Sequence, residues 1–124
     1  WIIGTNPVPG GYGIYWWDGD EWRAVEGGGR RIAVAPEGTP WITDSANRIL
    51  RHDGVRWVPM PGLATDIGIS VDGTPWVIGT DAGIYRWNGA TWGRIDGAGT
   101  NVTVTADGMP WVTNSVTEIY RRIR

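Results

Sequence analysis

Two rows of side chains, repeated along the chain at intervals of 35 residues, are the best candidates for ligand chemistry. The first row contains two tryptophans, a histidine and an arginine: Trp17, His52, Trp87 and Arg122. The second row places arginine in three of four copies: Trp16, Arg51, Arg86 and Arg121. An aromatic ring can stack on the apolar face of a sugar, and histidine and arginine can donate hydrogen bonds to its hydroxyls. Arginine also pairs with carboxylate or phosphate groups. The chemistry of both rows is compatible with contact to a glycan, and that of the second row with an acidic one.

Both rows also have purely structural explanations. Successive residues of a strand point to opposite faces of a sheet, so the two rows are expected on opposite faces. The first row would equally fit packing between neighbouring sheets. The arginines would equally fit salt bridges or a clamp on backbone carbonyls. The sequence leaves these alternatives open.

No set of residues points to catalysis. His52 is the single histidine, and the chain has no cysteine, so a Cys-His pair is excluded. No serine lies in a Gly-x-Ser-x-Gly elbow. The acidic stretch 18–21 lacks the spacing of a calcium loop and fits a hairpin turn. We therefore expect no enzyme activity, no cofactor and no metal site.

The composition excludes two classes of partner. The net charge is −2, and all 11 basic residues are arginine, which gives no basic surface for nucleic acid. No apolar run approaches the roughly 20 residues that span a bilayer. Ten tryptophans and 20 glycines in 124 residues, with no phenylalanine, depart far from average usage. Tryptophan supplies large contact areas and glycine supplies turns, so the bias is typical of a repeated β-structure.

The same period of 35 residues extends over the whole chain. A fixed period of this size indicates one supersecondary unit that is copied along the sequence. Residues that recur in every copy are most simply explained by packing, and we expect them in the core. They are four isoleucines and six tryptophans: Ile14, Ile49, Ile84, Ile119, Trp22, Trp57, Trp92, Trp41, Trp76 and Trp111.

One copy of the unit is predicted to contain four short strands. Alternating or β-branched segments lie at 67–71, 76–78, 84–87 and 92–95, separated by turn sequences such as Asp72-Gly73 and Asn88-Gly89. No segment has the period or length of a helix. Four hairpin-linked strands per copy predict an all-β fold, a β-propeller of four-stranded antiparallel blades. A β-solenoid and a β-trefoil are the alternatives.

The phase of the copies divides the chain into a partial blade 1–29, blades 30–64 and 65–99, and a partial blade 100–124. The expected strand numbers are three, four, four and three. Closed propellers contain about 4–8 full blades. We therefore expect that this segment self-associates or belongs to a longer parent chain.

The first copy carries an insertion. Trp1 and Ile14 are 13 residues apart, whereas Trp41 and Ile49 are 8 apart. The extra residues predict a longer, proline-stiffened loop over 5–12, with Tyr12 as a further candidate for ligand binding. A neutral insertion at a loop tip is the alternative.

The repeated pattern Gly-x-Pro-Trp-Val, Ile-Tyr-Arg and Trp-x-x-Ile resembles the tectonin repeat. The residues that carry the resemblance are Trp41-Ile42, Trp76-Val77, Trp111-Val112, Ile84-Tyr85-Arg86, Ile119-Tyr120-Arg121, Trp22, Trp57 and Trp92, with Ile49-Leu50-Arg51 as a looser match. Tyr15-Trp16-Trp17 departs from the pattern, and the copies at each end are incomplete.

Tectonin-family proteins are typically β-propellers, often six-bladed, and several are lectins of innate defence. The resemblance implies a glycan-binding module with several weak sites, whose partners would be glycans or lipopolysaccharide. Other members of the family are adaptors, so a protein-interaction scaffold is the alternative. The absence of cysteine leaves the cellular compartment undetermined. An extracellular or cell-surface location is favoured.

Overall fold

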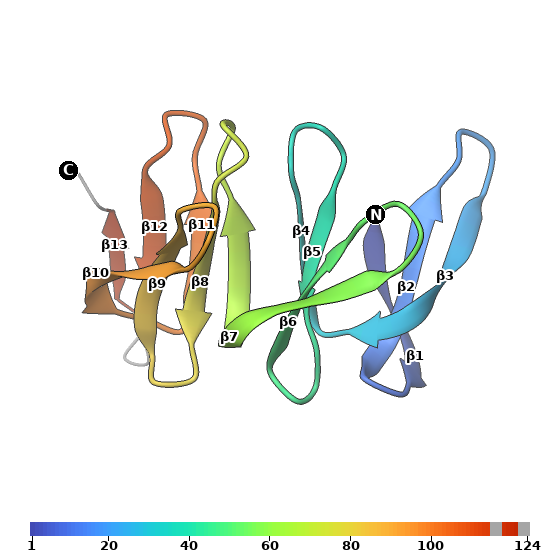
Figure 1. The fold of residues 1–124 in the computed structure, drawn as a ribbon, viewed down its shortest axis with the longest axis horizontal. Coiled ribbons are helices and arrows are strands. Elements are labelled where there is room, and N and C mark those ends of the chain that lie inside the picture. The colour runs from blue at the N-terminus through green and yellow to red at the C-terminus, as the bar shows by residue number, and fades with distance from the viewer. Residues whose placement is uncertain (115–117, 122–124) are drawn as a thin grey trace.

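The computed structural model describes residues 1–114 and 118–121 of the chain, so Arg122 of the first row lies outside the described residues. The described part is all-β (Figure 1). Its strands are β1 (Ile2–Val8), β2 (Gly11–Trp17), β3 (Trp22–Gly29), β4 (Arg31–Val34), β5 (Pro40–Thr43), β6 (Arg48–His52), β7 (Trp57–Ile69), β8 (Pro75–Gly79), β9 (Gly83–Trp87), β10 (Trp92–Ala98), β11 (Asn101–Val104), β12 (Pro110–Thr113) and β13 (Ile119–Arg121).

The strands pair with their neighbours in sequence, always antiparallel. The hydrogen-bonded sheets are β1-β2-β3, β4 to β10 in order, and β11-β12-β13 (Figure 1). The 13-residue strand β7 belongs to two blades, because it pairs with β6 up to Leu63 and with β8 from Ala64 onward. With β7 counted in both, the blades contain three, four, four and three strands. The architecture confirms the prediction of β-propeller blades.

Tight turns at one end of the blades contain the predicted Asp-Gly or Glu-Gly pairs at their third and fourth positions. Gly73 has a φ of 87°, which a residue with a Cβ rarely adopts. Asp72 accepts the Thr74 N–H at 3.0 Å and the hydroxyl proton of Ser70. These hydrogen bonds hold the pKa of the Asp72 carboxyl below its ordinary value of 3.8, and the bond from the Ser70 hydroxyl has the largest effect. The Thr105 hydroxyl, followed by the Met109 N–H, does the same for the pKa of Asp107.

Acid should therefore destabilise the fold through its turn aspartates. A carboxyl whose pKa is lowered on folding contributes stability that is complete above its ordinary value of 3.8 and is lost as pH falls through the lowered value. Melting temperatures measured between about pH 6 and pH 2.5 should fall mainly below about pH 4. Asp72→Asn should reduce this acid dependence, and an unchanged profile in that variant would contradict the assignment.

The core lies between blades. Residues of the second and third blades form one buried cluster: Trp41, Ile49, Ala64, Ile67 and Val77. Residues of the third and fourth blades form another: Trp76, Ile78, Ile84, Val102 and Val112. Each blade therefore depends on its neighbours for burial of apolar surface, as expected for a repeat protein.

Three of the residues predicted for the core are exposed, so this part of the prediction is wrong. Trp22 is 47% exposed, Trp111 is 38% exposed and Ile119 is 68% exposed. Trp22 lies in the first blade, with no blade before it in this sequence, and Ile119 lies in the edge strand β13. Side chains at these positions are buried by contact with a neighbouring blade and not by their own blade.

The predicted loop over 5–12 is also wrong. The insertion lengthens the β1–β2 hairpin instead, with Pro7 opposite Tyr12 and Val8 opposite Gly11. Asn6 supports the extension by accepting the Tyr15 hydroxyl proton at 2.9 Å. Proline is tolerated here because β1 is an edge strand of its sheet.

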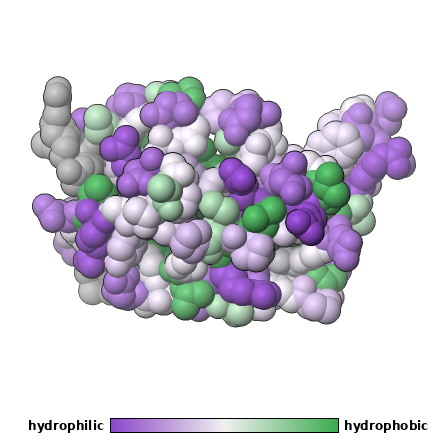
Figure 2. Space-filling view, in the orientation of Figure 1, coloured by the Kyte–Doolittle hydropathy of each residue, from purple (hydrophilic) through white to green (hydrophobic). Residues whose placement is uncertain are grey.

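Apolar and hydrophilic side chains are interspersed on the face of the molecule in view, where apolar groups form small patches (Figure 2). Among residues 1–114 and 118–121, no helix is long and apolar enough to cross a membrane.

Candidate functional site

The tryptophan at the start of the fourth strand of a blade binds the backbone of the preceding blade, and we call this contact the tryptophan clamp. Trp57 Nε1 donates to the Glu26 carbonyl at 2.8 Å, and Trp92 Nε1 donates to the Pro61 carbonyl at 2.8 Å. Each indole also lies on a glycine of that preceding blade. A Cβ at Gly27 would be 2.9 Å from the Trp57 ring. These contacts assign the repeated tryptophans a structural role.

The first candidate row lies beside these clamps. The His52 ring is 4.9 Å from Trp57 and 5.6 Å from Trp1 of the preceding blade. At the next junction the equivalent aromatic residues form a similar group: Trp87 is 4.9 Å from Trp92 and 6.1 Å from Trp41. These rings already have aromatic partners between blades.

Trp17 of the same row is less enclosed. It is 46% exposed and contacts Trp22, with 5.2 Å between ring centres. Tyr12 is 42% exposed in β2, opposite Pro7 and Gly29. A ligand-binding role for Trp17, His52, Trp87 and Tyr12 stays a prediction.

The second row forms a series of exposed arginines over tryptophans. The guanidinium carbon is 5.9 Å from the indole centre in the pair Arg51–Trp41 and 5.8 Å in Arg86–Trp76. Arg121 and Trp111 repeat the arrangement at 5.9 Å. In each case the two residues are direct partners across antiparallel strands. The ring fixes the arginine stem while the charged head stays in solvent.

A groove with polar and apolar walls surrounds Arg86. Two adjoining hollows of about 610 and 390 Å³ share four lining residues, Asp72, Thr74, Arg86 and Ile95. The positive charge of Arg86 contributes, after the hydrogen bonds of the turn, to the lowered pKa of Asp72. A guanidinium and a carboxylate that line the same groove offer donors and acceptors to one ligand.

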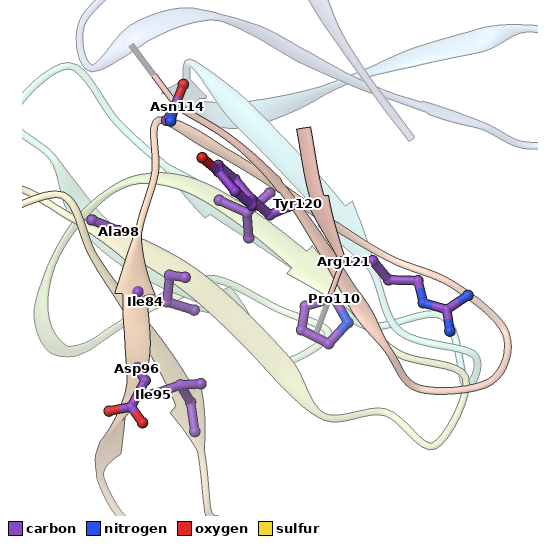
Figure 3. Close-up of a pocket in the computed structure, with 10 residues that line it drawn as sticks. Ile84, Ile95, Asp96, Ala98, Pro110, Asn114, Tyr120 and Arg121 are labelled. Carbon is purple, nitrogen blue, oxygen red and sulfur yellow. The ribbon is translucent and has the colours of Figure 1, made fainter. Parts of the chain in front are cut away.

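An apolar groove of about 500 Å³ lies between the third and fourth blades (Figure 3). Ile84, Ile95 and Tyr120 converge on it from β9, β10 and β13, while Arg121 extends away (Figure 3). Its wall includes Asp96 and Gly97, which align with Glu26-Gly27 and Pro61-Gly62 of the clamps. We interpret this groove as a surface for contact between blades rather than as a ligand site.

A third surface was not predicted from the sequence. We call the first strand of each of the last three blades its inner strand: β4, β7 from Ala64 onward, and β11. A polar cavity of about 420 Å³ lies where these inner strands begin, and residues 30–31, 65 and 99–101 contribute to it. Two rows at the period of 35 residues line or border it: Arg30, Thr65 and Thr100, and Arg31, Asp66 and Asn101. All members of both rows are polar or charged, and Arg30 and Arg31 stand where the equivalent positions 100 and 101 have threonine and asparagine, which is the signal that would have identified them.

Among residues 1–114 and 118–121, no cluster of three or more His, Asp or Glu side chains is placed to hold a metal ion.

No family model matches the chain. A stretch of 40 residues, 32% of the chain, is 42% identical to Tectonin-2 of Physarum polycephalum. That stretch amounts to 11% of Tectonin-2, so the comparison covers a small part of the relative.

The fold is similar to that of a solved structure described as YCF48 bound to D1 peptide. The TM-score is 0.60 at 14% sequence identity, over 74% of this chain and 36% of the other. The chain thus spans about a third of that structure. The local sequence match and the blade architecture agree with the repeated Trp and Ile-Tyr-Arg motifs. The chain is built of repeats similar to those of a tectonin, and these repeats form blades of a β-propeller.

Proposed function

We propose that this chain is a glycan-binding module with several weak, equivalent sites on the blades, and that it acts by binding rather than by catalysis. The observation that carries the proposal is the exposed Arg86, held over Trp76 at the wall of a groove that contains both polar and apolar side chains, Asp72 among them. Arg51 and Arg121 repeat its placement over an indole. A glycan-binding role accords with an extracellular or cell-surface location.

The chemistry of the groove suits a sugar. Adjacent hydroxyls of a ring can accept from the guanidinium of Arg86 and donate to the carboxylate of Asp72. Thr74 and Asn88 add further polar groups to the wall. Carboxylate or phosphate groups of an acidic glycan would pair with the arginine fork.

Binding at one site should be weak, near millimolar, because an open groove buries little of the ligand. Linked sites raise the effective concentration of a clustered ligand without new contacts. Clustered glycans should therefore bind far more tightly than single sugars. Acidic glycans or lipopolysaccharide should bind more tightly at low salt, because salt screens exposed charges.

The experiment is a glycan array at low salt, followed by titration of the strongest ligand into three proteins: wild type, Arg86→Ala and Arg56→Ala. Arg56 is an exposed arginine of the β6–β7 turn and does not line the groove, so it is the matched control. We expect a clustered ligand to bind about tenfold more weakly to Arg86→Ala, because one of the linked sites is lost, and to bind Arg56→Ala as it binds the wild type.

A protein-interaction scaffold is the second candidate. The structurally similar YCF48 is described as bound to a peptide, so a propeller of this kind can serve a protein partner. Equal affinity for single and clustered sugars, or no binding across a broad array at low salt, would favour this candidate over the glycan-binding one.

A further inference from the structure

The polar cavity at the start of the inner strands has the composition of a binding site for an anion rich in hydroxyls. It lies near the β5–β6 and β8–β9 turns, at the lower end of the blades in Figure 1 and opposite the Asp-Gly turns. Its lining contains two arginines, four threonines, two asparagines, an aspartate and two glycines: Arg30, Arg31, Thr43, Asp44, Asn47, Thr65, Gly79, Thr80, Gly99, Thr100 and Asn101. Every side chain in this lining is polar.

The negative charges near the cavity are already engaged. The buried carboxylate of Asp44 accepts from Arg48, with both guanidinium contacts at 2.7 Å, and from the Ala46 and Arg48 N–H groups. Asp66 accepts the Val102 N–H at 2.9 Å and lies 3.9 Å from Arg31 Nε. Neither carboxylate needs a further cation.

Arg30 supplies positive charge that the fold does not use. Within residues 1–114 and 118–121, no ion pair or side-chain hydrogen bond engages its guanidinium, while its backbone N–H donates to the Thr43 carbonyl at 2.7 Å. Its stem lies against the lengthened β1–β2 hairpin, where a Cβ at Gly11 would be 3.2 Å from Arg30 Cγ. The insertion in the first blade therefore helps to position this arginine.

We propose that this cavity binds the carboxylate of an acidic sugar, with Arg30 as the principal cation. The arginine fork matches a carboxylate, and the threonine hydroxyls and asparagine amides of the wall can bond the ring hydroxyls. A volume of about 420 Å³ lies within the usual range for small-ligand sites.

The lining favours a sugar acid over a peptide terminus. A peptide carboxylate would bring an apolar or bulky side chain with it, and peptide-recognition sites supply pockets for such side chains. This cavity has no apolar or aromatic side chain in its lining. The site is separate from the groove at Arg86, so the inference does not depend on the proposed function.

The probe is glucuronate, with glucose as its neutral counterpart and inorganic phosphate as a second anion. Backbone amide shifts in NMR titrations locate the binding, and the Gly79 and Gly99 amides report on the cavity. We expect glucuronate to shift these amides and glucose to leave them unchanged. Raising the salt concentration should weaken the binding.

Four proteins separate this inference from the proposed function: wild type, Arg30→Ala, Arg56→Ala and Arg86→Ala. At the cavity, as reported by the Gly79 and Gly99 amides, Arg30→Ala should weaken glucuronate binding at least about tenfold, whereas Arg56→Ala and Arg86→Ala should give the same cavity shifts as the wild type. Because Arg30 is exposed, melting temperatures should stay equal across the set. Arg30→Lys should retain part of the affinity, since it keeps the charge without the fork.

The inference would be overturned by equal binding of glucose, by binding of phosphate without glucuronate, or by wild-type affinity in Arg30→Ala. Shifts confined to the groove, and lost in Arg86→Ala, would also overturn it while supporting the proposed function. Conversely, failure of the glycan array together with cavity shifts that depend on Arg30 would reject the proposed function and support the inference.

Discussion

Replacing Trp92 with alanine should lower the free energy of unfolding by about 3 kcal/mol, at the lower end of the range for large aromatic residues because its side chain is only partly buried. The substitution removes the indole donor from the Pro61 carbonyl and the ring contacts with Trp87 and Trp41. It also leaves a gap over Gly62. Denaturant titration monitored by far-ultraviolet circular dichroism would measure the change.

Trp22→Ala is the matched control, because Trp22 has the same place in the repeat but is 47% exposed. Its ring contacts Trp17, and we expect a loss of less than about 1 kcal/mol, within the usual value of one aromatic pair. An equal loss in the two variants would show that the tryptophan stabilises its own blade rather than the junction.

The second large effect is expected at Asp66, which joins the inner strands of neighbouring blades. This aspartate is 7% exposed and accepts the Val102 N–H of the next blade at 2.9 Å. Asp66→Ala would leave that buried N–H without its acceptor, which costs about 1–3 kcal/mol. The change in stability would be measured by the same denaturant titration.

Asp66→Asn should cost less than Asp66→Ala, since an amide oxygen still accepts a hydrogen bond. Asp96→Ala, at an exposed aspartate, serves as the control and should change stability by no more than about 0.5 kcal/mol. Equal stability of the alanine and asparagine variants would contradict the assigned hydrogen bond.

Local features of the fold could be predicted because a hairpin is specified by nearby residues. Asp72-Gly73 indicates a tight turn wherever it occurs, and the alternation around it sets the strands. The position of arginine over tryptophan follows from the same information. Once the register of the β8–β9 hairpin is fixed by its turn, Trp76 lies opposite Arg86.

Contacts between blades could not be predicted in the same way. Trp92 bonds a carbonyl 31 residues earlier, and Gly62, on which its ring lies, looks in the sequence like another turn glycine. The exposure of Trp22 likewise depends on what lies beside its blade and not on its own motif. Local periodicity contains no information on either point.

The candidate site was predicted in part. The arginine row is exposed, as ligand binding requires, whereas His52 and Trp87 lie among aromatic residues of two blades. The cavity at Arg30 could not be predicted because its lining comes from strand starts and turns of three blades, which no local motif brings together. At positions 30, 65 and 100 the copies share a location, and only the first of them carries an arginine.

The tryptophan clamp has a direction, and this bears on how such a protein changes in evolution. Each unit presents the indole to the unit before it and offers a carbonyl and a glycine to the unit after it. The interface is therefore heterologous, like the contact between successive subunits of a filament. A duplicated unit brings both halves of the joint with it and can be inserted in frame between existing units without a compensating mutation. Gain or loss of whole units is thus an easier change for this architecture than alteration of a single joint.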